Sequence, residues 1–121
     1  MSDHNKLRAF KEAIAVGCDA AGIPWSVFSR NRCLKEFELD TDFQNSHPKE
    51  IAADALEHLC DRSLNRFDQV VCIAVVIFLD SVIGPPNEDP SKRMRMQALK
   101  DVLEKSGTRS AYLKWADSWY D

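Results

Sequence analysis

The feature that most constrains this chain is the segment 65–84, NRFDQVVCIAVVIFLDSVIG, which contains an uninterrupted apolar run at 70–79. Because that run carries no polar side chain, we expect it to keep no face in water and to form the centre of the core. A short run rich in Val and Ile suits either a buried strand or a buried helix. Asn65 followed by Asp68 is typical of a helix start, and Gly84 before two prolines is typical of a helix end. No convincing partner strand lies elsewhere, so we predict a helix.

Length and composition predict one soluble domain over residues 1–121. The chain has 121 residues, of which 45% are hydrophobic and 29% charged, as in ordinary globular proteins. The net charge of −3 argues against a surface built wholly for nucleic acid. The apolar run is shorter than the about 20 residues that span a bilayer, so we expect no membrane contact. The N-terminal residues MSDHNKLRAFKEA are polar and of mixed charge, unlike a signal or transit peptide, so we expect a cytoplasmic protein.

The other segments show the apolar spacing of amphipathic helices. Pro24, Pro48 and Pro90 stand where prolines open helices, and Asp89 is expected to cap the helix that Pro90 opens. Asn31 can break the second helix into two. Thr108 can cap the last helix. The expected helices occupy approximately 3–21, 24–39, 48–62, 90–106 and 109–121. We therefore predict an all-α fold, a compact single-domain bundle of five to six helices around the buried hydrophobic helix 65–84.

Cysteine and histidine give no metal or redox motif. Cys18, Cys33, Cys60 and Cys72 are irregularly spaced, without a C-x-x-C pair, and are expected to be buried free thiols. His58 lies one helical turn after Asp54, but no second His or Cys lies at ligand spacing on that helix. His47, directly before a proline, is expected to serve a helix start. We expect no metal and no cofactor.

Acidic residues cluster before the third helix. The segment DTDFQNS is similar to the opening of an EF-hand loop, but Asn45 stands where that loop needs glycine and Ile51 where it needs a bidentate glutamate. The cluster is therefore interpreted as a solvated rim or as an acidic face for a basic protein partner. Its members are Glu36, Glu38, Asp40 and Asp42.

The segment AAGIPWSVFSR, within 14–33, resembles the turn and second helix of helix-turn-helix DNA-binding proteins. Ala21, Gly22, Ile23 and Phe28 match the small residue, the turn glycine and the two apolar positions of that motif. Gly17 and Asn31 depart from it, because those places are usually apolar. The resemblance implies that a second set of residues would face DNA, with the arginines contacting phosphate or bases. That set is Ser26, Ser29, Arg30 and Arg32.

Two further surfaces are candidates for binding a partner. Arg93 and Arg95 lie on the most basic predicted helix, which is either a solvated face or a surface for an acidic partner. Near the end of the chain lies a dense aromatic group, Tyr112, Trp115, Trp119 and Tyr120. Because neighbouring helical residues point about 100 degrees apart, we expect at least one of these rings to stay exposed and to anchor a partner or a second copy.

Motifs of catalysis are absent: the chain has no glycine-rich phosphate loop, nucleophile elbow or paired histidines on a helix. We therefore expect a non-enzymatic protein-binding module that acts as an inhibitor, adaptor or regulator. In size and composition it is similar to bacterial immunity proteins and to phage-encoded inhibitors of host defence. A helix-turn-helix DNA-binding regulator that uses residues 14–33 is the alternative.

Overall fold

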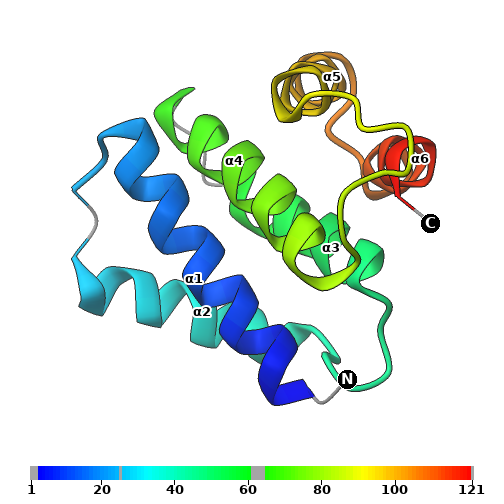
Figure 1. Ribbon diagram of the computed structural model, residues 1–121. Coiled ribbons are helices and arrows are strands. Elements are labelled where there is room, and N and C mark those ends of the chain that lie inside the picture. The colour runs from blue at the N-terminus through cyan, green and yellow to red at the C-terminus, as the bar shows by residue number, and fades with distance from the viewer. Residues whose placement is uncertain (1–2, 25, 61–64, 121) are drawn as a thin grey trace.

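The computed structural model describes residues 3–24, 26–60 and 65–120, and these ranges fold into six α-helices (Figure 1). No strand occurs within them, so the all-α prediction is confirmed. None of the described helices is long and apolar enough to cross a membrane. The helices are α1 (Asp3–Ala21), α2 (Val27–Asp40), α3 (Pro48–Cys60), α4 (Asn65–Val82), α5 (Lys92–Lys105) and α6 (Arg109–Trp119).

The hydrophobic helix α4 is the centre of the bundle, as predicted. It packs against α1, α3 and α5, and α6 packs against α3 and α5 on the side away from α1 (Figure 1). The expectation that the apolar run of α4 keeps no face in water is wrong along one stripe of the helix. In that stripe Ile73 and Ile77 are partly exposed, between the exposed Gln69 and Ser81. The neighbouring helices do not close around the whole circumference of α4, and residues spaced by four stay at the uncovered side.

Helix α1 approaches α4 very closely at Gly17. A Cβ atom at this position would lie 2.7 Å from the carbonyl oxygen of Val70 and 3.4 Å from the Cβ atom of Ala74. Backbone atoms of α4 therefore occupy the space that any other side chain would need. The glycine that departs from the helix-turn-helix pattern thus has a structural reason, because it lets the two helices meet.

Most helix ends follow the sequence signals, with two corrections. Gly22 ends α1 with a φ of 68°, and Ile23 donates a backbone hydrogen bond to the Cys18 carbonyl, as expected of a glycine cap. Helix α2 begins at Val27 rather than Pro24 and runs unbroken through Asn31. The Thr108 hydroxyl accepts from the Ala111 N–H, which confirms the cap of α6.

The start of α5 differs from the prediction. Ser91, and not Asp89, is its N-cap, with a side chain that accepts from the Met94 N–H. Asp89 instead closes a turn by donating its N–H to the Pro86 carbonyl at 3.0 Å, and it has a φ of 42°. That left-handed conformation is one that Asp tolerates better than most residues, but it takes Asp89 out of the extended geometry that an N-cap needs.

A cluster of phenylalanines joins α2 and the following loop to α1 and α4. The Phe10 and Phe37 rings stack at 5.1 Å, Phe10 meets Phe78 edge-on at 5.5 Å, and Phe43 meets Phe37 at 5.6 Å. The Lys6 ammonium donates to the carbonyls of Phe43 and Ser46, so the loop is held by charge as well as by the ring. Phe43 therefore fixes the loop.

Some expected core residues are confirmed and others lie outside the described part. Cys18 and Cys72 are buried, and burial raises the pKa of the Cys72 thiol to about 12, so this thiol is unreactive at neutral pH. The side chains of Cys33, Cys60 and Phe28, and all of Trp25, lie outside the described residues.

The His47 side chain caps the start of α3, as predicted. Its Nδ1 atom accepts from the Lys49 N–H at 3.1 Å, and its backbone N–H donates to the Glu50 carboxylate at 3.3 Å. Partial burial and the positive charge of Lys49 lower the pKa of His47 below 6.5. The neutral ring is the form that can accept this bond, so protonation removes the cap.

Acidification is therefore expected to weaken the protein through His47. Because the pKa is lower in the folded state, the contribution is complete above the unfolded pKa of about 6.5 and is lost as the pH falls through the folded pKa. We expect the free energy of unfolding, measured by urea titration, to fall less between about pH 7 and pH 5 in His47→Asn, because Asn caps without titrating. Equal losses in the two proteins would contradict this role.

Candidate binding site

A largely buried ion pair ties together the end of α4, the start of α5 and the end of α6. The Arg95 side chain is 4% exposed, and its Nη2 atom donates to the Asp80 Oδ2 atom at 2.7 Å. The Tyr120 hydroxyl donates to the Asp80 Oδ1 atom at 2.8 Å and accepts from the Arg95 Nε atom at 3.1 Å. The Arg95 Nη1 atom also donates to the Pro90 carbonyl. Each of the three side chains is thus held by the other two, and the Pro90 backbone is held with them.

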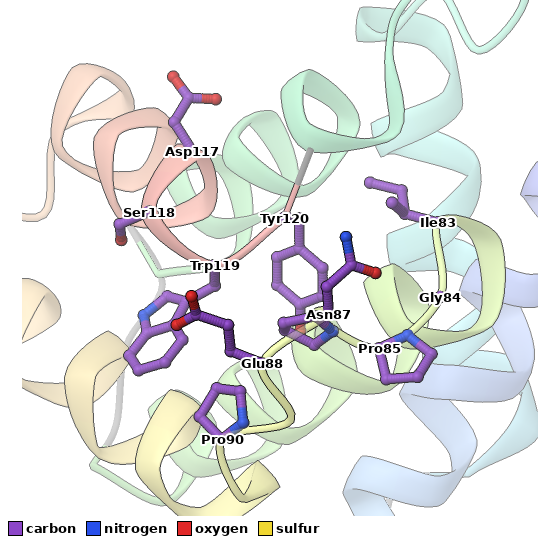
Figure 2. Close-up of a pocket in the computed structure, with 11 residues that line it drawn as sticks. Ile83, Gly84, Pro85, Asn87, Glu88, Pro90, Asp117, Ser118, Trp119 and Tyr120 are labelled. Carbon is purple, nitrogen blue, oxygen red and sulfur yellow. The ribbon is translucent and has the colours of Figure 1, made fainter.

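A hollow of about 410 Å³ lies directly beside this network, between the loop after α4 and the end of α6. Figure 2 shows the loop residues on one side of the hollow, with Trp119 and Tyr120 facing them from the end of α6. Its volume falls in the range of about 300–1,000 Å³ that is typical of ligand sites. The hollow is lined by residues 83–88, by Pro90 and by residues 117–120.

The loop side of the hollow is held rigidly. Gly84 closes α4 with a φ of 99°, and its N–H donates to the Leu79 carbonyl at 3.3 Å. The prolines that follow have a fixed φ, and the turn from Pro86 to Asp89 is closed by a backbone hydrogen bond. Because Pro90 is held by Arg95, the loop is fastened at both ends and in the middle. A surface formed in this way loses little entropy on binding.

The charged residues that line the hollow are both acidic. The Asp117 carboxylate pairs with the Lys49 ammonium at 2.8 Å and is 64% exposed. Glu88 is exposed, and no ion pair within the described ranges neutralises it. Burial, followed by the hydrogen bond to Asp80, raises the pKa of Tyr120, so this ring stays a neutral phenol at physiological pH. The hollow therefore presents net negative charge beside an aromatic wall.

The predicted aromatic and basic surfaces are only partly accessible. Trp115 and Tyr120 are 5% and 3% exposed, so the expectation that they offer a contact surface is wrong. Both belong to the core, because α6 packs against α3 and α5 and the Tyr120 hydroxyl is bonded to Asp80 of α4 and Arg95 of α5. Trp119 is partly exposed, which agrees with the expectation that one ring stays accessible.

The two arginines of α5 that were predicted to bind a partner differ in their exposure to solvent. Arg93 is exposed, whereas Arg95 is 3% exposed and paired with Asp80. The interpretation of Arg95 as a surface cation is therefore wrong. Asp80 supplies the reason, because a carboxylate at the end of the hydrophobic helix needs a buried cation.

The predicted acidic rim serves mainly local structure. The Asp42 carboxylate accepts from the Asn45 side chain at 2.7 Å and from the Gln44 N–H at 3.1 Å, and these bonds, led by that of the Asn45 side chain, lower the pKa of Asp42. Glu36 lies 3.8 Å from Arg32, and Glu38 is partly exposed. The side chain of Asp40 lies outside the described residues. None of these acidic residues lines the hollow beside α6.

The residues predicted to contact DNA are described only in part. Ser26 and Arg32 are exposed, and the side chains of Ser29 and Arg30 lie outside the described residues. The stacked rings that join the two helices belong to the first half of α1 and the second half of α2, far from the turn between them (Figure 1). Helix-turn-helix motifs pack their helices at about 90–120° around a short turn, so this distant contact is not their signature.

Asp54 and His58, the pair considered as a metal site, contact other side chains. The Asp54 carboxylate binds the Arg109 Nε atom at 2.6 Å and so links α3 to α6. His58 lies against the Phe37 ring at 5.9 Å. Within residues 3–24, 26–60 and 65–120, no group of three or more potential ligands could hold a metal ion.

Three residues of the site were missed at the level of sequence: Asp80, Glu88 and Asp117. Asp80 carried a usable signal, since a carboxylate that directly follows ten apolar residues predicts a buried partner. Glu88 and Asp117 carried none, because acidic residues in a loop and near a helix end are ordinary.

Comparison with known proteins gives no relative for this chain: no protein-family model, curated protein or solved structure matches it.

Proposed function

We propose that this chain is a protein-binding module, acting as an inhibitor, adaptor or regulator, and that the hollow beside α6 receives its partner. The observation that carries the proposal is the partly exposed Trp119 at the edge of a pre-formed hollow. Tryptophan is among the residues that contribute most to the binding energy of protein interfaces, especially beside a pocket.

The construction of the hollow favours binding over catalysis. Asp80 and Arg95 neutralise each other, and the Tyr120 hydroxyl is bonded to both, so no group of this network is left to donate or accept a proton. What remains accessible is an aromatic face, proline rings, two carboxylates, the Asn87 amide and the Ser118 hydroxyl. Such a surface can hold a side chain, and the Ser118 hydroxyl donates to a backbone carbonyl at 2.6 Å rather than to a general base that would activate it as a nucleophile.

Truncation of Trp119 is expected to weaken the capture of the partner. Tagged protein would be incubated with nuclease-treated lysate of the source organism, and bound proteins would be identified and quantified. We expect one stoichiometric protein partner, whose purified form binds Trp119→Ala about 30-fold more weakly than the unchanged chain, as for an interface residue worth about 2 kcal/mol. Trp119→Phe should retain most of the binding.

Met94→Ala is the matched control, because Met94 is 57% exposed on α5 and does not line the hollow. Thermal unfolding followed by circular dichroism would establish that the variants are folded. Equal capture by Trp119→Ala and Met94→Ala would contradict the proposed site. Recovery of nucleic acid alone, with no protein left after digestion, would favour the helix-turn-helix alternative.

A further inference from the structure

The charge of the hollow narrows the chemistry of what can enter it, if the proposed function holds. Of its charged lining residues, Asp117 is already paired with Lys49, while Glu88 has no cation among the described residues. The neighbouring cations Lys92 and Arg93 are exposed on α5 and do not line the hollow. A partner group that enters therefore meets an uncompensated carboxylate.

The aromatic wall stands beside that carboxylate. Figure 2 shows the Glu88 carboxylate and the Pro90 ring, both from the loop, turned toward the Trp119 indole at the end of α6, and all three line the hollow. The face of an indole attracts cations, and tryptophan does so more strongly than tyrosine or phenylalanine. A carboxylate and an indole face in one hollow therefore both favour the binding of a cationic group.

We propose that the hollow binds an arginine side chain on an extended segment of the partner protein, with the guanidinium between the Trp119 indole and the Glu88 carboxylate. Arginine suits this place better than lysine, because its planar guanidinium stacks on an aromatic face while its edge donates two hydrogen bonds to a carboxylate. The volume of about 410 Å³ is larger than one arginine side chain needs. The partner residues next to the arginine are therefore expected to enter the hollow as well.

The fixed loop strengthens the argument. Glu88 lies within the turn from Pro86 to Asp89, and that turn is closed by a hydrogen bond and anchored through Pro90 to Arg95. The carboxylate is therefore carried on a backbone that does not have to rearrange when the cation arrives. A charged group on a fixed backbone loses less conformational entropy on binding than one on a mobile segment.

Selection from a displayed library of random linear peptides tests the inference. The purified chain is the bait, and Trp119→Ala is the counter-bait that removes peptides bound elsewhere. We expect the enriched peptides to share one arginine. In a synthetic copy of the best peptide, replacing that arginine by citrulline, its neutral isostere, should weaken binding at least about tenfold by calorimetry, as should Glu88→Lys in the protein. Glu104→Lys is the matched control, because Glu104 is exposed on α5 outside the hollow and its reversal should leave the affinity unchanged.

The outcomes separate this inference from the proposed function. Peptides that depend on Trp119 but bind equally well with citrulline would overturn the arginine inference and leave the binding module intact. Weakening by Glu88→Lys and Glu104→Lys to the same extent would overturn it too, because the effect would then come from total charge. A bait that enriches no peptide over Trp119→Ala would contradict both proposals.

Discussion

Replacement of Arg95 by methionine is expected to lower the free energy of unfolding by about 2–3 kcal/mol. The methionine fills similar space but leaves the Asp80 carboxylate without its cation and the Tyr120 hydroxyl without one of its partners. Breaking one side of such a pair is destabilising because the Asp80 carboxylate, with a side chain only 23% exposed, loses its cation while most of its surface stays out of water. Such a loss is a large part of the total stability of a small domain. Chemical denaturation of the purified variant measures it.

Arg93→Met is the control, since Arg93 is two residues away on the same helix and exposed. We expect its effect to stay within about 0.5 kcal/mol. In the double variant Asp80→Asn with Arg95→Met, the losses should be clearly less than additive, because each change alone leaves the other group unpaired. Equal effects of Arg93→Met and Arg95→Met, or simple additivity, would show that the pair contributes no coupling.

Replacement of Gly17 by leucine is the second large effect that we expect. The leucine Cβ atom would lie 2.7 Å from the Val70 carbonyl oxygen, so α1 must move away from α4 along their whole contact. Overpacking typically lowers the free energy of unfolding by about 1–3 kcal/mol. Because the atom in the way belongs to the backbone and cannot rotate aside as a side chain could, we expect a loss of about 3 kcal/mol. The higher helix propensity of leucine opposes this loss by less than about 1 kcal/mol.

Val16→Leu provides the comparison, because Val16 precedes Gly17 on α1 and is 48% exposed. The same new residue should change the stability there by only a few tenths of a kcal/mol. If urea unfolding gave the two leucine variants equal stability, the close approach of α1 to α4 would be incorrect.

Much of the fold could be predicted because it follows from periodicity and from helix-end chemistry. The apolar run 70–79, the glycine at 22 and the threonine at 108 each act through contacts within a few residues, and such signals are visible in a sequence. The start of α5 was misplaced because Asp89 is held by a turn that competes with the capping role. The exposed stripe at Ile73 depends on how many helices surround α4, which no local pattern encodes.

The candidate site was predictable only in outline. The aromatic group indicated the end of the chain where the candidate hollow lies, but which ring stays accessible depends on how α6 is rotated against α3. Arg95 was assigned to the surface because basic residues on one helix appear equivalent until their partners are known. Its partner, Asp80, lies 15 residues away, and their pairing arises only when the ends of α4 and α5 meet.

Nuclear magnetic resonance mapping of the bound partner would test the central claim most directly. The isotope-labelled chain would be titrated with the purified partner, or with the selected arginine peptide, and changes in the backbone amide and indole N–H signals would be recorded. We predict that the largest changes fall on residues 83–90 and 117–120, including the Trp119 indole. Changes concentrated on α2, or on α5 around Arg93, would contradict the assignment of binding to the hollow.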